Sequence, residues 1–182
     1  EDNRPNTYKF YNLDSLVTDY YYEYHKNLQI KEVPNFNDNG LFDGNWESFY
    51  QSGEVHKKDI YSNGLKNGVW LSFHEDNRLN NYKFYNLDSL VTYYDYEYFK
   101  NLQIKEKPSF NDDGLYDKQW TSFFKNGKTQ KIFHYKNGIK SSLWTVFWDS
   151  TYNNHTETMY ENDKRNGTYF DWYVNANPKE EG

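Results

Sequence analysis

The chain has 182 residues, a length that suits one domain or one continuous array of repeats. Its formal net charge is −6 and it has no basic run, which argues against nucleic acid and anionic membranes as main partners. No apolar stretch approaches the ~20 residues that a transmembrane helix needs, and nothing reads as a signal peptide. The absence of cysteine excludes disulfides and thiol chemistry, and the compartment stays open.

Aromatic residues are unusually frequent, with 6 Trp, 20 Tyr and 13 Phe. Disordered chains are poor in aromatic residues, whereas a folded chain buries roughly 150–250 Å² with each aromatic side chain. We therefore expect a folded protein that is held together by rings rather than by aliphatic packing.

The beginning of the chain returns near its middle. The stretch EDNRPNTYKFYNLDSLV at residue 1 recurs as EDNRLNNYKFYNLDSLV at residue 75, and residues 1–74 match residues 75–148 at 45 of 74 positions. Self-similarity of this kind is the signature of repeat architectures. We expect a single repeat domain over 1–182, made of the duplicated blocks 1–74 and 75–148, an extra unit at 149–177 and a polar tail at 178–182.

Each block divides again into thirds. The shared pattern is an aromatic anchor, a second aromatic residue three positions later and then a turn, as in GVWLSFHEDN from residue 68. The tyrosine-rich stretch YYEYHKNL at 21–28 fits the same frame. Seven units of 24 or 25 residues follow. Their anchors in chain order are Tyr21, Trp46, Trp70, Asp95, Trp120, Trp144 and Tyr169.

A second turn lies between successive anchors, as in YSNGLKNG at 61–68 and YKNGIKSS at 135–142. Asn-Gly is a strong hairpin signal because both residues tolerate positive φ, and no helical period is present. The predicted fold is all-β, an elongated single-layer stack of antiparallel β-hairpins. Three units depart from the pattern, the first, fourth and sixth, so their regularity is in doubt. NLDSLV replaces the Asn-Gly turn at 12–17 and 86–91, Asp95 takes the fourth anchor position, and Ser141-Ser142 replaces Asn67-Gly68.

The segments YSNGLKNGVWLSF and YKNGIKSSLWTVF resemble the MORN-repeat variant of bacterial proteins that are often described as antitoxin-like. The resemblance covers essentially the whole chain. It implies an elongated stack of antiparallel hairpins that serves as a non-catalytic binding or scaffold module. An antitoxin-like or immunity-like role, with a toxin or effector as partner, is implied by the resemblance alone.

Enzyme signatures are weak, so we expect no catalysis, no cofactor and no metal site. The histidines show no metal-ligand spacing, and the carboxylates have no predicted cleft in which to act as a pair. The stretch NFNDNG at 35–40 hints at a calcium loop, but the twelfth position then falls on Trp46 instead of the required Glu. This stretch is therefore predicted to be a turn.

Alternating tyrosines are the candidate binding residues, because residues two apart share one face of a strand. Rows of tyrosine suit recognition surfaces, being large, rigid and amphipathic. They equally suit a carbohydrate-binding strip, or a structural ladder of cross-strand pairs. The candidates form two trios, which at three units apart would lie roughly 28 Å from each other. They are Tyr20, Tyr22 and Tyr24, with Tyr94, Tyr96 and Tyr98.

The two blocks have diverged unevenly. Residues 1–43 match their counterparts at 34 of 43 positions, whereas residues 44–74 match at only 11 of 31. Recent recombination would explain this step, and so would a shared requirement in the tyrosine-rich part. The favoured function is non-catalytic binding of another protein. The alternative is an envelope or surface module that binds glycan through an aromatic strip.

Overall fold

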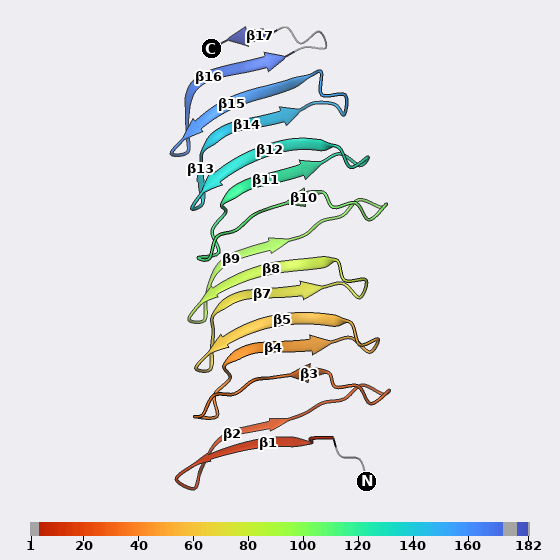
Figure 1. The fold of residues 1–182 in the computed structure, drawn as a ribbon, viewed down its shortest axis with the longest axis vertical. Helices are drawn as coiled ribbons and strands as arrows, with labels where there is room; N and C mark the ends of the chain where they lie inside the picture. The colour runs from red at the N-terminus through yellow and green to blue at the C-terminus, as the bar shows by residue number, and fades with distance from the viewer. Residues whose placement is uncertain (1–3, 173–177, 182) are drawn as a thin grey trace. The chain divides into compact units, whose positions relative to one another are not determined.

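The computed structural model describes residues 4–172 and 178–181 (Figure 1). Every regular secondary-structure element in these residues is a β-strand. The strands pair antiparallel in open sheets, and most connections between them are hairpins. The predicted all-β hairpin stack is confirmed. The chain divides into two compact units, residues 1–95 and 96–182, so that the division falls 21 residues after the sequence duplication restarts at residue 75. Each unit is described by itself.

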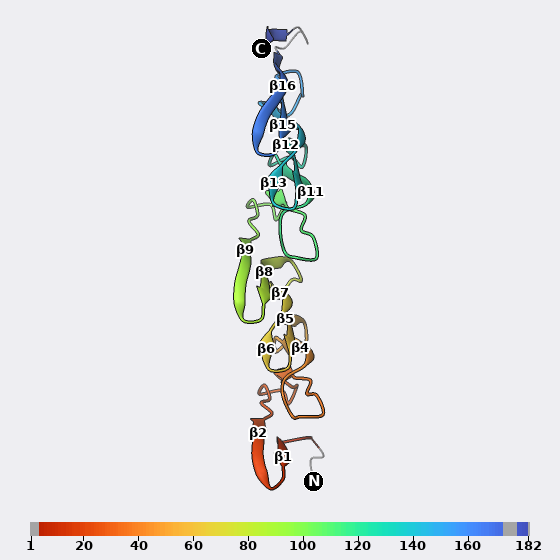
Figure 2. The ribbon, with the colours of Figure 1, turned by 90° about the vertical axis from the view of Figure 1, so that its left-hand side faces the viewer.

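Unit 1 holds a two-stranded and a seven-stranded sheet. Its strands are β1 (Thr7–Asn12), β2 (Ser15–Tyr21), β3 (Glu32–Val33), β4 (Gly44–Phe49), β5 (Val55–Ser62), β6 (Leu65–Lys66), β7 (Gly68–Phe73), β8 (Leu79–Asn86) and β9 (Ser89–Asp95). Strands β1 and β2 pair only with each other, and the larger sheet has the order β3-β4-β5-β7-β8-β9, with β6 beside β5. Figure 2 shows β4 to β7 nearly edge-on, as one layer of strands.

Unit 2 holds one sheet of eight strands. They are β10 (Glu106–Lys107), β11 (Lys118–Phe123), β12 (Thr129–Lys136), β13 (Ile139–Lys140), β14 (Ser142–Phe147), β15 (His155–Glu161), β16 (Lys164–Trp172) and β17 (Pro178–Glu181). The order is β10-β11-β12-β14-β15-β16-β17, with β13 beside β12. The expected polar tail at 178–182 thus contains an edge strand, β17, because its backbone pairs with β16. Part of the expected extra unit, 173–177, lies outside the described residues.

Residues 22–43 depart from the two-strand unit that the repeat predicts. Only β3 and two isolated bridges, Tyr24↔Ile30 and Phe36↔Phe42, interrupt this loop between β2 and β4. Buried Pro34 follows β3 directly and cannot donate to a ladder. The stretch NFNDNG is a turn as predicted, since the Asn37 side chain accepts hydrogen bonds from the backbone N–H groups of Asn39 and Leu41.

The hairpin turns that lack Asn-Gly have the same backbone conformation as those that contain it. Asn63 and Gly64 both have positive φ, the signature of a type I′ turn. Leu13 and Asp14 take the same conformation, with φ of 46° and 66°, and their counterparts Leu87 and Asp88 repeat it. The NLDSLV turns are therefore as regular as the Asn-Gly turns. Each of them places a leucine in a strained backbone conformation.

A row of aromatic rings, tilted against one another, supplies the packing of each unit. In unit 1 the row passes from Trp46 to Tyr61, Trp70 and Tyr85 at centroid distances of 5.3, 5.1 and 5.0 Å. Because a single layer has no second sheet to cover it, Tyr82 is the one aromatic side chain below 9% exposure among the described residues. Stability therefore rests on rings that are half-buried against their neighbours along the stack.

Candidate functional site

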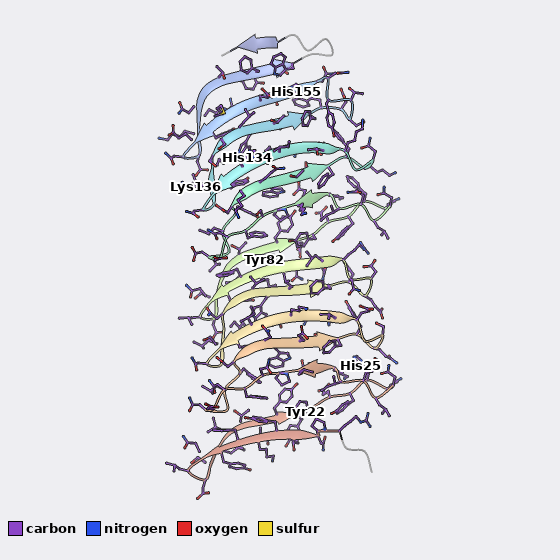
Figure 3. The ribbon with its side chains drawn as sticks, in the orientation of Figure 1. Tyr22, His25, Tyr82, His134, Lys136 and His155 are labelled. Carbon is purple, nitrogen blue, oxygen red and sulfur yellow. The ribbon has the colours of Figure 1, made fainter. Side chains whose placement is uncertain are left out.

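The first tyrosine trio lies at the end of β2 and in the loop that follows. All three side chains are half-buried. Tyr20 and Tyr22 make an edge-to-face pair at 5.2 Å, and the Tyr20 hydroxyl donates to Glu32 at 2.9 Å. Burial, with help from the Glu32 carboxylate, raises the pKa of Tyr20 well above its usual range. Figure 3 places Tyr22 over the sheet, and His25 at the edge where the loops lie.

Tyr24 is engaged at the other end of the trio. Its hydroxyl donates to the backbone carbonyl of Pro5, and the Arg4 guanidinium lies over its ring at 4.9 Å from the centroid. Tyr20 also touches the ring row through Trp46 at 5.9 Å. These three tyrosines therefore support the fold and leave only part of each ring accessible.

The second trio divides between the two units. Tyr94 lies in β9 opposite Tyr82, while Tyr96 and Tyr98 belong to unit 2. All three are half-buried, as their counterparts are. Burial raises the pKa of the Tyr96 hydroxyl, and Tyr98 forms an isolated bridge with Ile104.

The tyrosines that the hairpins expose are different ones. Tyr21 in β2 is 58% exposed and Tyr93 in β9 is 50% exposed. Each donates to a neighbouring carboxylate two residues away: Tyr21 to Asp19 at 3.2 Å, and Tyr93 to Asp95 at 2.5 Å. The two copies therefore carry the same Asp–Tyr pair in opposite order on the exposed face.

A lysine from the first strand of each hairpin joins this pair. Lys9 lies 3.4 Å from the Asp19 carboxylate, and Lys83 lies over the Tyr93 ring at 5.5 Å from its centroid. Sequence alignment of the copies hides this similarity, because positions 19 and 21 both count as mismatches. Only the strand geometry shows that Asp and Tyr have exchanged places on one face.

The apex of each tyrosine hairpin also presents aliphatic side chains to solvent. In the first copy Leu16 and Val17 are 49% and 43% exposed, and in the second Leu90 and Val91 are 52% and 44% exposed. The bulge in each hairpin, next to Tyr11 or Tyr85, lets both aliphatic residues face outward. We refer to these four residues as the apex patches. Sequence reasoning missed them, although the exact repetition of NLDSLV was the signal.

Both apex patches belong to unit 1. Strands β1 and β2 form one of the hairpins, β8 and β9 form the other, and Figure 1 shows their turns at the same side of this unit. A scattered exposed leucine needs no explanation, but the same exposed pair at equivalent places in two copies is a recurring surface feature.

The surface of each unit has a hollow. One, of about 560 Å³ on unit 2, is lined by residues that include Lys136, Ser142, Met159 and Tyr160. Another, of about 270 Å³ on unit 1, is lined by residues that include Asp59 and Trp70. Among the described residues, no group of three or more His, Asp or Glu side chains is placed to hold a metal ion.

Comparisons with known proteins add no identity. No protein-family model matches this chain, and no curated protein matches it either. Over residues 4–172 and 178–181, no helix is long and apolar enough to cross a membrane.

Proposed function

We propose that this chain is a non-catalytic protein-binding module, and that its contact surface is the pair of tyrosine hairpins. The observation that carries the proposal is the duplicated exposure of the apex patches, Leu16 with Val17 and Leu90 with Val91. Exposed apolar groups of this kind, rimmed by polar residues, are typical of protein interaction sites.

The two tyrosine trios act in this proposal as a rigid support with accessible edges. Half-buried tyrosines lose little entropy on binding because neighbouring rings already hold them. Tyr21 and Tyr93 add exposed aromatic area on the opposite face of the same hairpins. The resemblance to antitoxin-like MORN-repeat proteins extends the proposal to the partner, which would be a toxin or effector protein.

The test is quantitative binding to a partner isolated with the wild-type chain. The apex variant carries Leu16→Ser, Val17→Thr, Leu90→Ser and Val91→Thr, all at exposed positions. We expect this variant to lose detectable binding with an unchanged melting temperature. A matched control replaces exposed Ile139 and Leu143, which belong to unit 2, and keeps full affinity. Full affinity of the apex variant would refute the proposal.

Glycan binding is the second candidate, favoured by the exposed Tyr, Asp and Lys groups that recur on both hairpins. A ring for stacking beside a carboxylate and an ammonium suits a polar sugar face. A glycan panel distinguishes the two candidates. Binding that is lost with Tyr21→Ala and Tyr93→Ala, but kept by the apex variant, would favour glycan.

A further inference from the structure

Among the described residues, the outer edge of β1 is an unpaired backbone edge. Strand β1 pairs with β2 alone, and no other described strand pairs with it. The Tyr22 N–H donates to the Asn6 carbonyl at 2.9 Å, so Asn6 faces β2. Backbone groups alternate along a strand, which directs those of Thr7, Lys9 and Tyr11 outward. Three residues therefore offer N–H and C=O groups to an incoming strand.

The sequence duplication shows what such an edge accepts. Residues 8–18 are identical to residues 82–92, and the second copy begins in β8, whose outer edge is covered by β7. The register places Trp70 opposite Lys83 and Gly68 opposite Tyr85. The Trp70 ring lies 5.0 Å from the Tyr85 ring, and Lys66 lies over both rings. Within the described residues, β7 therefore covers one copy of this edge, and no strand pairs with the other copy.

The turn of the hairpin also takes part in the covered copy. Lys66 donates its backbone N–H to the Asp88 carboxylate at 2.7 Å, and the Asp88 N–H donates to the Lys66 carbonyl at 2.8 Å. The counterpart of Asp88 is Asp14, to which no described residue is hydrogen-bonded. At the β1 edge, Asp14 is therefore in place to accept an N–H group, as Asp88 accepts the N–H of Lys66 at the β8 edge.

Exposure separates this edge from the apex patches. Leu16 and Val17 are as exposed as Leu90 and Val91, so β7 does not cover the apex in the second copy. In contrast, Leu13 is 95% exposed where Leu87 is 58% exposed. Tyr11 is 55% exposed, whereas its counterpart Tyr85 is half-buried by Trp70 and Lys66.

We propose that the β1 edge binds, by strand addition, an extended segment of another protein with the pattern of β7. That pattern is Lys-Asn-Gly-x-Trp-x-Ser-Phe, as at residues 66–73. The Trp packs on Tyr11 and faces Lys9, the Gly admits Tyr11, and the segment's Lys donates its N–H to Asp14. Main-chain bonds supply affinity in such complexes, and the alternate side chains supply specificity.

The probe is a labelled synthetic peptide with the sequence of residues 65–74, added to the intact chain. We expect saturable binding and slower amide exchange at Thr7, Lys9 and Tyr11. Exchange at Asn81, Lys83 and Tyr85 should not change, because β7 already covers them. A peptide with alanine in place of its tryptophan should bind at least tenfold more weakly.

Two protein variants locate the site. Lys9→Pro removes one outward N–H while leaving the β2-facing groups intact, and proline is tolerated on an edge with its nitrogen toward solvent. This variant should lose peptide binding, and its NMR spectrum should show that the β1–β2 hairpin is still folded. Where Lys9→Pro disturbs the hairpin, Tyr11→Ala is used, with Tyr85→Ala as its matched control. Tyr11→Ala should weaken peptide binding, and Tyr85→Ala should not.

Three results would overturn the proposal: no peptide binding, binding that survives Lys9→Pro in a folded hairpin, or protection at another edge. Sedimentation across a concentration series tests a second copy of the chain as the occupant. Self-association that Lys9→Pro abolishes would assign the edge to that copy instead of a partner strand.

Discussion

Lys118 and Ser142 occupy backbone positions that the first copy fills with glycine. Their φ angles are 62° and 59°, in the left-handed region, and the counterparts Gly44 and Gly68 have φ of 78° and 90°. A side chain there carries a backbone strain of about 1 kcal/mol. The second copy therefore contains strain that the first copy lacks.

We predict that Lys118→Gly and Ser142→Gly each stabilise the chain by about 0.5–1 kcal/mol. The reverse change Gly44→Lys should destabilise it by a similar amount, since the space around Gly44 is open and only φ opposes a side chain. Chemical denaturation of each single variant measures the effect. A loss of stability in both glycine variants would show that unfolded-chain entropy outweighs the strain.

Asp59 lies beside the ring row and has the most strongly shifted pKa among the described carboxyl groups. It stands opposite Trp46, and burial raises its pKa to about 6 against an ordinary value near 4. Lys57 and Lys83 only partly offset this burial. The counterpart in the second copy is Phe133, which stacks on Trp144 at 4.0 Å. The Asp59 carboxylate therefore occupies a position at which the second copy packs an aromatic ring.

Because the folded pKa of Asp59 exceeds its unfolded value, protonation of this group stabilises the folded state. That contribution is complete below about pH 4 and is lost as the pH rises through 6. We expect Asp59→Asn to exceed the wild type in free energy of unfolding by about 1 kcal/mol at pH 7.5. This figure is reduced from the full shift because the carboxyl is partly exposed.

At pH 4 the Asp59→Asn and wild-type chains should unfold with the same free energy. Denaturation curves between pH 4 and 7.5 check the convergence. A difference that grows on acidification would contradict the assigned direction of the pKa shift.

At the scale of an element, each ring-bearing strand is held by its neighbours in the row. Trp70 in β7 packs between Tyr61 and Tyr85, and its indole N–H donates to the Ile60 carbonyl at 2.8 Å. Turn-to-turn hydrogen bonds follow the same period, as from Asn37 to Asn63 at 2.9 Å. Neighbouring elements thus stabilise one another as in other linear arrays.

Trp70→Ala should cost about 3 kcal/mol of unfolding free energy, at the lower end for large aromatic residues because Trp70 is half-buried. Trp120→Ala, in β11, should cost a similar amount. Trp148 is 65% exposed and is the matched control, with an expected cost below about 1 kcal/mol. Equal small losses at all three positions would mean that the row does not carry the stability.

At the scale of the whole molecule, the duplication gives two equivalent hairpins within unit 1. A partner that spans both gains from effective concentration, which raises affinity without any new contact. Two such patches at three repeat units would lie roughly 28 Å apart. The uneven divergence of the copies agrees with a shared requirement in these hairpins and with recombination alike.

Replacing one apex patch should therefore lower partner affinity by a factor on the order of 10²–10⁴, and replacing both should abolish binding. The first tyrosine trio is tested beside it, with Tyr20, Tyr22 and Tyr24 changed to Ser, followed by the second trio. We expect either change to weaken binding far more than it lowers the melting temperature. A large fall in melting temperature with unchanged affinity would make the tyrosines a structural ladder only.

The all-β class and the hairpin turns at Asn63 and Asn137 could be predicted from the sequence alone. These features follow from local chemistry, because positive φ and strand propensity act over a few residues. NLDSLV at 12–17 lacks Asn-Gly and therefore does not predict a regular hairpin turn. Only the structure shows that Leu13 adopts positive φ and closes one.

Which tyrosines face solvent was decided by tertiary structure. Alternation predicts that Tyr20, Tyr22 and Tyr24 share one face of a strand, but β2 ends at Tyr21. Alternation also could not tell which side the stack covers. The loop at 22–43 folds back on the hairpin: the Thr18 hydroxyl donates to the Gly40 carbonyl, and a side chain at Gly40 would collide with Phe10. This contact between distant segments half-buries the alternate tyrosines and leaves Tyr21 exposed, because packing rather than periodicity selects the covered face.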